Sequence, residues 1–127
     1  MKLEHTAIDV PDPEGAIAWW CANLGMRRSA PGGAFIVDDS GTAGLEFYRA
    51  STTPAAPDYR AADPMTLHIA FESGDIAADA ARLAAAGATT VSQDIAPDGT
   101  GIAMLRDPWG VPLQLCKRAK GIFLESK

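Results

Sequence analysis

The N-terminal part of the chain passes from a strand-like pattern to a helical one. Residues 3–10 alternate with period two, which indicates a strand, and a proline-rich turn ends it. Apolar side chains then recur at the spacing of one helix face, which predicts a helix over 13–24. The members of this face are Ile17, Trp20, Cys21 and Leu24. Asp12 is the expected N-cap of this helix, and Gly25 is its expected C-terminal stop.

Short strands separated by turn-rich segments follow this helix. We expect them at 26–29, 34–37 and 44–49. Residues 51–64 have no periodicity and are rich in Pro, Ala, Thr and Asp, which is typical of a linker or a lid. The earlier order of elements then returns. It comprises a strand at 66–71, a helix opened by Asp75 and closed by Gly87, and strands at 88–93, 101–106 and 111–117.

Both halves begin with one pattern, H-x-A followed by an apolar residue and an acid. The two copies hold His5 and His68, the only histidines in the chain. Each half reads as strand, helix and three strands, with Glu46 or Gln114 on the last strand. A unit of this size is too small to bury its own core, so the two copies should pair their sheets.

We therefore predict an α+β fold, in which two βαβββ modules pair into a barrel-like sheet with a concave cup. The chain would form one domain. Its parts would be a first module at about 1–50, a linker at 51–64, a second module at about 65–118 and a tail at 119–127.

Strand alternation predicts which way the polar side chains of these strands face. The neighbours of the histidines are mostly helix-packing types: Thr6, Ile8, Leu67, Ile69 and Phe71. The histidines should therefore face the side of the sheet away from the helices, and Glu46 and Gln114 should face the same side.

Four polar side chains would then line one concave surface: His5, Glu46, His68 and Gln114. A carboxylate in an apolar cup is costly unless it is paired or bound to a cation. Two imidazoles, a carboxylate and an amide oxygen suit a divalent metal with water completing its shell. Two other interpretations stay open: Glu46 could form a buried ion pair with Arg27 or Arg49, and Gln114 could be a plain hydrogen-bonding residue.

Composition narrows the classes of partner. The chain has 127 residues, of which 47% are hydrophobic and 21% are charged, and its net charge is −5. This balance argues against nucleic acid or an anionic membrane as the main partner, because both require clustered Lys and Arg. No apolar run approaches the roughly 18 residues that span a membrane. Two cysteines without metal-type spacing, and no recognisable signal peptide, favour reduced thiols and a cytoplasmic protein.

The chain resembles the glyoxalase/bleomycin-resistance/extradiol-dioxygenase superfamily, also called vicinal oxygen chelate proteins. The resemblance covers nearly the whole sequence. It rests on the motifs H-T-A-I-D-V, A-I-A-W-W-C-A-N-L-G-M, G-L-E-F-Y, H-I-A-F, R-L-A-A-A-G-A and R-D-P-W-G-V-P-L-Q-L. As a fold signature this set is specific, but activity depends on the site rather than on the fold.

The resemblance implies a metal held by His5, Glu46, His68 and Gln114, which would be zinc, nickel, iron, manganese or cobalt. It implies a small oxygen-chelating substrate, a lyase, isomerase or dioxygenase reaction, and a homodimer. One position departs from the pattern, because glyoxalase-like members carry Glu where this chain has Gln114. An amide cannot accept a substrate proton, so Glu46 would be the only base among the ligands. The competing interpretations are a metal-free ligand-binding or drug-resistance-type protein and a catalytically silent accessory module.

Overall fold

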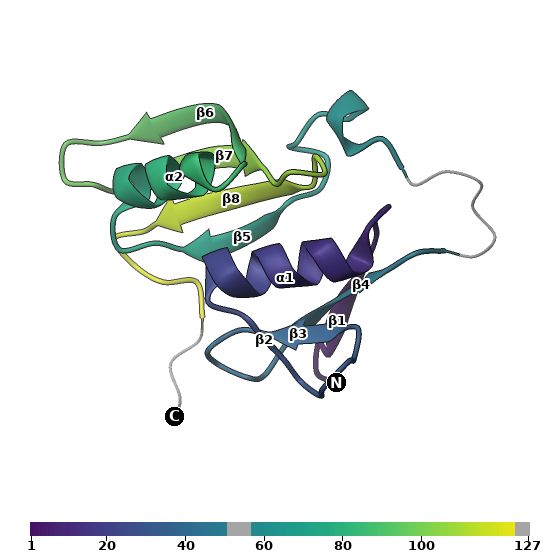
Figure 1. Ribbon diagram of the computed structural model, residues 1–127. Helices are drawn as coiled ribbons and strands as arrows, with labels where there is room; N and C mark the ends of the chain where they lie inside the picture. Colours follow the sequence, from purple (N-terminus) through teal and green to yellow (C-terminus); the bar gives the residue numbers. More distant parts are fainter. Residues whose placement is uncertain (51–56, 124–127) are drawn as a thin grey trace. The chain divides into compact units, whose positions relative to one another are not determined.

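The computed structural model describes residues 1–50 and 57–123, and the chain divides into two compact units, Met1–Asp58 and Tyr59–Lys127 (Figure 1). Each unit contains one helix and one four-stranded sheet, which confirms the predicted α+β class and the βαβββ repeat. The predicted linker and tail fall partly on 51–56 and 124–127, which lie outside the described residues. None of the described helices is long and apolar enough to cross a membrane.

The first unit is a mixed sheet covered by one helix. Its elements are β1 (His5–Asp9), α1 (Pro13–Leu24), β2 (Arg27–Arg28), β3 (Phe35–Val37) and β4 (Gly44–Tyr48). The strand order is β1-β4-β3-β2, in which β1 and β4 are parallel and the other pairs are antiparallel. The first and last strands of the repeat are therefore hydrogen-bonded neighbours.

Helix α1 begins and ends where the sequence predicted. The Asp12 carboxylate accepts the Gly15 N–H at 3.0 Å, and Gly25 has the left-handed φ of 66° that a helix C-terminus favours. The buried face differs slightly from the predicted one, because Ala16 is fully buried with Ile17 and Trp20, whereas Cys21 and Leu24 are only half-buried. The Trp20 ring packs on Phe47 of β4 with 5.1 Å between ring centroids.

The second unit repeats this plan with longer strands. Its elements are η1 (Tyr59–Ala61), β5 (Ile69–Glu72), α2 (Ile76–Ala85), β6 (Thr89–Ile95), β7 (Gly101–Arg106) and β8 (Pro112–Lys117). The strand order is β5-β8-β7-β6, and again the first strand is parallel to the last. Helix α2 is capped by the Asp75 carboxylate, which accepts the Ala78 N–H at 3.0 Å. The helix buries Ile76, Ala80 and Leu83.

The start of β5 corrects one prediction. The strand was expected from residue 66, but it begins at Ile69, so His68 lies just before the strand rather than within it. The reason is a turn centred on Asp63, whose carboxylate accepts the Met65 N–H at 2.8 Å and whose carbonyl accepts the Thr66 N–H at 2.9 Å. Leu67 is 67% exposed, so the expectation that it packs against a helix is also wrong.

The described part of the expected linker or lid, residues 57–64, is not a slack segment. It contains the 3-10 turn η1, and two of its carbonyls, those of Tyr59 and Ala62, accept hydrogen bonds from Arg106 at the end of β7. The absence of sequence periodicity did not reveal this, because the anchoring comes from a residue more than forty positions away.

Gly101 is predicted to be a stability-determining residue of the second unit. Its φ is +145°, and a Cβ there would lie 2.1 Å from the carbonyl oxygen of Asp94 on the paired strand β6. We expect Gly101→Ala to lower the free energy of unfolding by about 2 kcal/mol or more, because the backbone must shift to relieve the overlap. Urea denaturation measures this loss. Gly74→Ala is the matched control, since a Cβ at Gly74 meets nothing within 4 Å, and equal midpoints for the two variants would contradict the prediction.

Candidate functional site

Glu46 lies on the face of the first sheet that points away from α1. Its neighbours along β4, Leu45 and Phe47, are buried, and Phe47 packs on the helix, so alternation turns Glu46 to the other side as predicted. Ala7 and Phe35 are its partners on the adjacent strands. The carboxylate is half-buried and forms no hydrogen bond or ion pair with any other residue in the described part of the chain.

The alternative interpretation of Glu46, an ion pair with Arg27 or Arg49, is not supported. Arg49 instead pairs with Asp9 at 3.3 Å, and Arg27 donates to the backbone carbonyl of Asp38 at 3.1 Å. The half-buried carboxylate of Glu46 is therefore open to a cation or donor from outside the chain.

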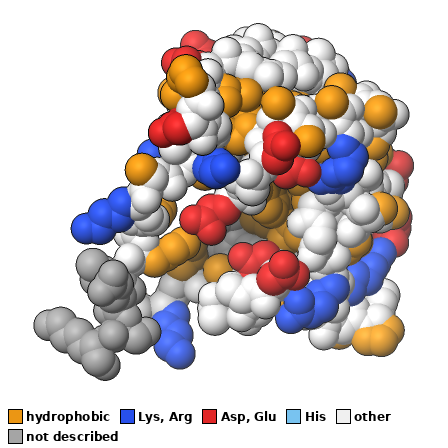
Figure 2. Space-filling model, turned by 90° about the vertical axis from the view of Figure 1, so that its left-hand side faces the viewer, with side chains coloured by type: hydrophobic (Ala, Val, Ile, Leu, Met, Phe, Trp, Pro, Cys, Tyr) orange, Lys and Arg blue, Asp and Glu red, His pale blue; other side chains and the backbone are white. Residues whose placement is uncertain are grey.

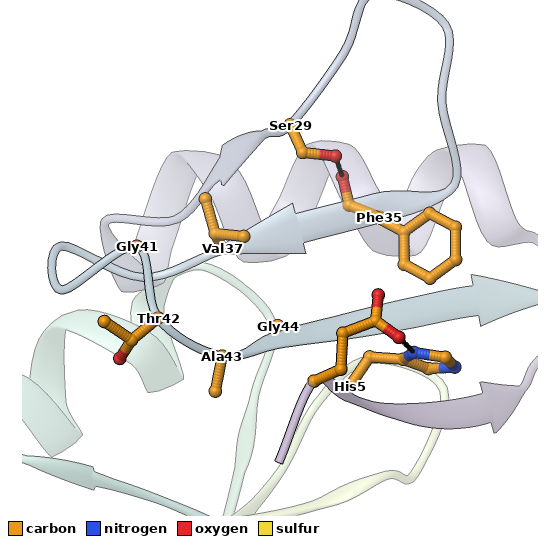
Figure 3. A pocket seen from close by; sticks show the side chains of 9 residues that line it. His5, Ser29, Phe35, Val37, Gly41, Thr42, Ala43 and Gly44 are labelled. Carbon is orange, nitrogen blue, oxygen red and sulfur yellow. Dashed lines mark hydrogen bonds and ion pairs between the residues drawn. The ribbon is translucent and has the colours of Figure 1, made fainter. Parts of the chain in front are cut away.

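His5 occupies the same face at the start of β1. Its Nδ1 lies 3.0 Å from the Glu4 carboxylate, and its ring meets the edge of Phe35 with 5.0 Å between centroids (Figure 3). A charged carboxylate can only accept, so Nδ1 carries the hydrogen in this contact. In the neutral ring, Nε2 then keeps its lone pair and can act as a ligand.

An open pocket of about 250 Å³ adjoins His5 in the first unit (Figure 3). Small or uncharged residues of β1, β3 and the loop before β4 form most of its wall. They are His5, Ser29, Phe35, Val37, Gly41, Thr42, Ala43 and Gly44, and the charged Glu4 also lines the pocket. Glu46 is not among the lining residues, so the pocket and the carboxylate share a sheet face without forming one cavity.

His68 and Gln114 meet in the second unit. Gln114 is paired with Ala70 and Met104 on the neighbouring strands, and it is only 6% exposed. Its side-chain nitrogen lies 3.5 Å from His68 Nε2, while His68 Nδ1 lies 3.0 Å from the carbonyl oxygen of Pro64. A carbonyl can only accept, so Nδ1 carries the hydrogen here as well.

In both units the histidine therefore carries its hydrogen on Nδ1. In each, an oxygen acceptor holds Nδ1–H, so that Nε2 keeps its lone pair, which is the arrangement usual for histidines that bind metals. In His68 this lone pair faces the Gln114 amide nitrogen at 3.5 Å. Two donor atoms about 2.1 Å from one cation at a tetrahedral angle lie about 3.4 Å apart. The 3.5 Å between the His68 and Gln114 side-chain atoms matches that separation, and half a turn of the amide would present Oε1 instead of nitrogen.

Each unit thus supplies two of the four predicted ligands. His68 and Gln114 lie in contact. His5 and Glu46 share a sheet face, on which His5 pairs with Gly44 of β4, and Glu46 pairs with Ala7 of β1. Neither unit groups three His, Cys, Asp or Glu side chains as a metal site among the residues that are described. Sequence reasoning missed the Nδ1 partners. Glu4 could have been found from its position beside His5, but no sequence signal marks the Pro64 carbonyl.

The Cys21 thiol is not an activated nucleophile. Burial raises the pKa of Cys21 on α1, and the neighbouring Arg28 guanidinium lowers it by a smaller amount. Charged side chains of both signs are interspersed on the face drawn in Figure 2. The arrangement is therefore one of imidazole, carboxylate and amide donors rather than of a reactive cysteine or a strongly basic surface.

Two βαβββ units, each with an imidazole and an oxygen-bearing side chain at matching positions, define the class of protein as a duplicated glyoxalase-type fold. The family model of the glyoxalase-like domain matches residues 5–116. The chain belongs to this family. Among curated proteins, none matches the chain significantly.

Several solved structures share the fold. A glyoxalase family protein from Bacillus cereus has 20% identity and a TM-score of 0.67, with 91% of each chain covered. TnmS3, an antibiotic binding protein from Streptomyces sp. CB03234, has 21% identity and a TM-score of 0.64, covering 91% of this chain and 94% of its own. The trypanothione-dependent glyoxalase I of Leishmania major has 21% identity and a TM-score of 0.63, covering 91% and 86%. At these identities the likeness extends to the fold alone.

The raised pKa of Cys21 predicts slow thiol chemistry. At pH 7.5 less of this thiol is ionised than in a free cysteine, and the thiolate is the reacting form. We expect folded Cys116→Ala protein, in which Cys21 is the remaining thiol, to react with Ellman's reagent several-fold more slowly than the same variant in urea. Absorbance at 412 nm follows the reaction. A folded-state rate equal to or above the unfolded-state rate would contradict the prediction.

Proposed function

We propose that this protein is a metal-dependent enzyme of the glyoxalase superfamily. In this proposal His5, Glu46, His68 and Gln114 bind one divalent cation, and the substrate is a small molecule with two neighbouring oxygen atoms. The observation that carries the proposal is the matched presentation of the two imidazoles. Both keep the hydrogen on Nδ1, held by an oxygen acceptor, and a lone pair on Nε2, although one acceptor is a side chain and the other a backbone carbonyl.

The remaining donors support the same ligand set. Glu46 supplies the anionic oxygen, and its carboxylate has no other partner among the described residues. Gln114 supplies a neutral oxygen at a position too buried for a charge that lacks a counterion. A bound divalent ion would polarise substrate oxygens as a Lewis acid.

The chain's own residues divide the remaining work. Glu46 would take a proton from the substrate, since neither Gln114 nor an imidazole bound through Nε2 can do so at neutral pH. General-base help of this kind contributes roughly 100- to 10,000-fold to a rate. The Phe35 ring packs against the His5 ring in a T-shaped contact. The apolar side chain of Phe35 would exclude water from the substrate side of the His5 ring.

A metal-free ligand-binding function is the second candidate, and the pocket beside His5 favours it. Most of the residues that line this pocket are uncharged, with one aromatic ring, which suits a neutral or planar ligand more than an anion. One structural relative is an antibiotic binding protein. Ligand binding that is unchanged by a chelator would support this function instead.

Metal titration of the untagged protein tests the main proposal. We expect one divalent ion per chain by calorimetry and elemental analysis. His68→Ala should weaken binding at least about 100-fold, because a lost ligand costs more than the 10- to 100-fold typical of an outer contact. Glu46→Gln should weaken binding and abolish turnover. Asp39→Asn, an exposed carboxylate of the same unit, is the control and should change neither. Absence of a bound metal in the wild-type protein would refute the proposal.

The buried amide offers a separate test, through Gln114→Glu. Without metal at pH 8, the new carboxylate would be buried without a cation, so stability should fall by roughly 2 kcal/mol or more. With metal at 100 times the dissociation constant of the wild-type protein, binding adds about 2.7 kcal/mol to the stability of the wild type. At the same metal concentration the variant should gain more, because the extra anionic ligand should tighten binding. Urea denaturation with and without metal measures both values. If metal leaves the stability gap between variant and wild type unchanged, Gln114 is not a ligand.

A further inference from the structure

We propose that Arg106 is a positioning residue for His68, acting through the segment of residues 59–66, here called the strap. Only the expected effect on metal affinity rests on the proposed function. The contacts that carry the inference all lie within the second unit. Arg106 lies at the end of β7, and within the described part of the chain its hydrogen-bond partners are backbone carbonyls rather than His68 or Gln114.

Arg106 joins the strap to the turn between β7 and β8. One guanidinium nitrogen donates to the carbonyl of Tyr59 at 2.7 Å and to that of Gly110 at 3.1 Å. The other terminal nitrogen donates to the carbonyl of Ala62 at 2.8 Å. With two acceptors in the strap and one in the turn, the guanidinium fixes both the position and the tilt of the strap, which a lysine with its single nitrogen cannot do.

The turn that receives the strap is itself rigid. The Asp107 side chain is fully buried and accepts the N–H groups of Trp109 and Val111, each at 2.9 Å. Gly110 has a φ of +92° and no side chain, so the stem of Arg60 packs directly against it. Arg60 also donates to the carbonyl of Pro108 at 2.6 Å, which gives the strap a second anchor.

The far end of the strap sets the state of His68. The Asp63 turn closes residues 63–66 with two hydrogen bonds, and the Pro64 carbonyl inside it accepts His68 Nδ1–H at 3.0 Å. Since this carbonyl holds the hydrogen on Nδ1, it directs the Nε2 lone pair toward Gln114. Loosening the strap would free the ring to exchange its hydrogen between the two nitrogens and to turn away from Gln114.

The test reads the tautomer of His68 directly, in protein without metal. The chain has only two histidines, so a His5→Gln background leaves a single imidazole in a long-range proton–nitrogen NMR spectrum. At pH 8 we expect His68 to show one tautomer, protonated at Nδ1. Arg106→Ala should replace it with a mixture of both tautomers, and Arg106→Lys should restore it only in part. Arg82→Ala, which removes an exposed arginine of α2 in the same unit, should leave it unchanged.

Metal titration in the wild-type background is the second readout. Arg106→Ala should weaken binding about 10- to 100-fold, the cost usual for a residue that orients a ligand from outside the metal shell. A folded Arg106→Ala protein with an unchanged His68 tautomer would overturn the inference, and so would an unchanged metal affinity. If Arg106→Ala does not fold, Arg60→Ala carries the test, because Arg60 is exposed and its removal frees one anchor. An unchanged tautomer in Arg60→Ala would then overturn the inference.

The two proposals fail separately. If the wild-type protein binds no metal, the proposed function fails, while the tautomer of His68 still decides whether Arg106 positions it. If the wild-type protein binds metal and the Arg106 variant keeps either the tautomer or the affinity, only the positioning inference fails.

Discussion

The parallel pairing of the first and last strand of each unit is the constraint on which the site depends. It makes Ala7 the partner of Glu46 and Ala70 the partner of Gln114. In both units a histidine stands two residues before that alanine, so each repeat presents an imidazole at the start of its first strand or just before it, and an oxygen-bearing side chain on its last strand. The strand that closes the repeat can reach this place only because α1 or α2 carries the chain across the sheet and buries the opposite face.

The duplication is regular in its strands but not in what supports the histidines. His5 lies in β1 and its Nδ1 depends on Glu4, a flexible and exposed side chain that is 82% accessible. His68 precedes β5 and its Nδ1 depends on a backbone carbonyl inside a hydrogen-bonded turn. A fixed carbonyl costs no side-chain entropy to hold, so the second imidazole is the better preorganised of the two. The first unit therefore has no copy of the strap among its described residues; the Glu4 side chain takes the place of the Pro64 carbonyl there.

Local signals in the sequence were sufficient to predict most helices and strands. They failed where contacts between distant residues determine the local structure. The N-caps of both helices and the C-cap of α1 could be predicted, because Asp12, Asp75 and Gly25 act on their own neighbours, whereas α2 is capped by Ala86 rather than by the expected Gly87. Alternation also placed Glu46 on the open face. The late start of β5 was missed because the turn at Asp63 competes with strand pairing, and the strap was read as a linker. Its order comes from Arg106, whose partners in the strap lie more than forty residues away, beyond the reach of any periodicity.

Gln114 gives the proposed site a charge different from that of a site with two carboxylates. A divalent cation with two neutral imidazoles, one amide and the single carboxylate of Glu46 would keep one net positive charge, whereas a second carboxylate would cancel it. Away from bulk water such a charge would attract a substrate anion strongly, because Coulomb energies there are several times those in water. The ligand set would therefore favour substrates that bring or develop negative charge on oxygen. It would also leave the second unit without a buried anion when no cation is bound, which agrees with the near-complete burial of Gln114.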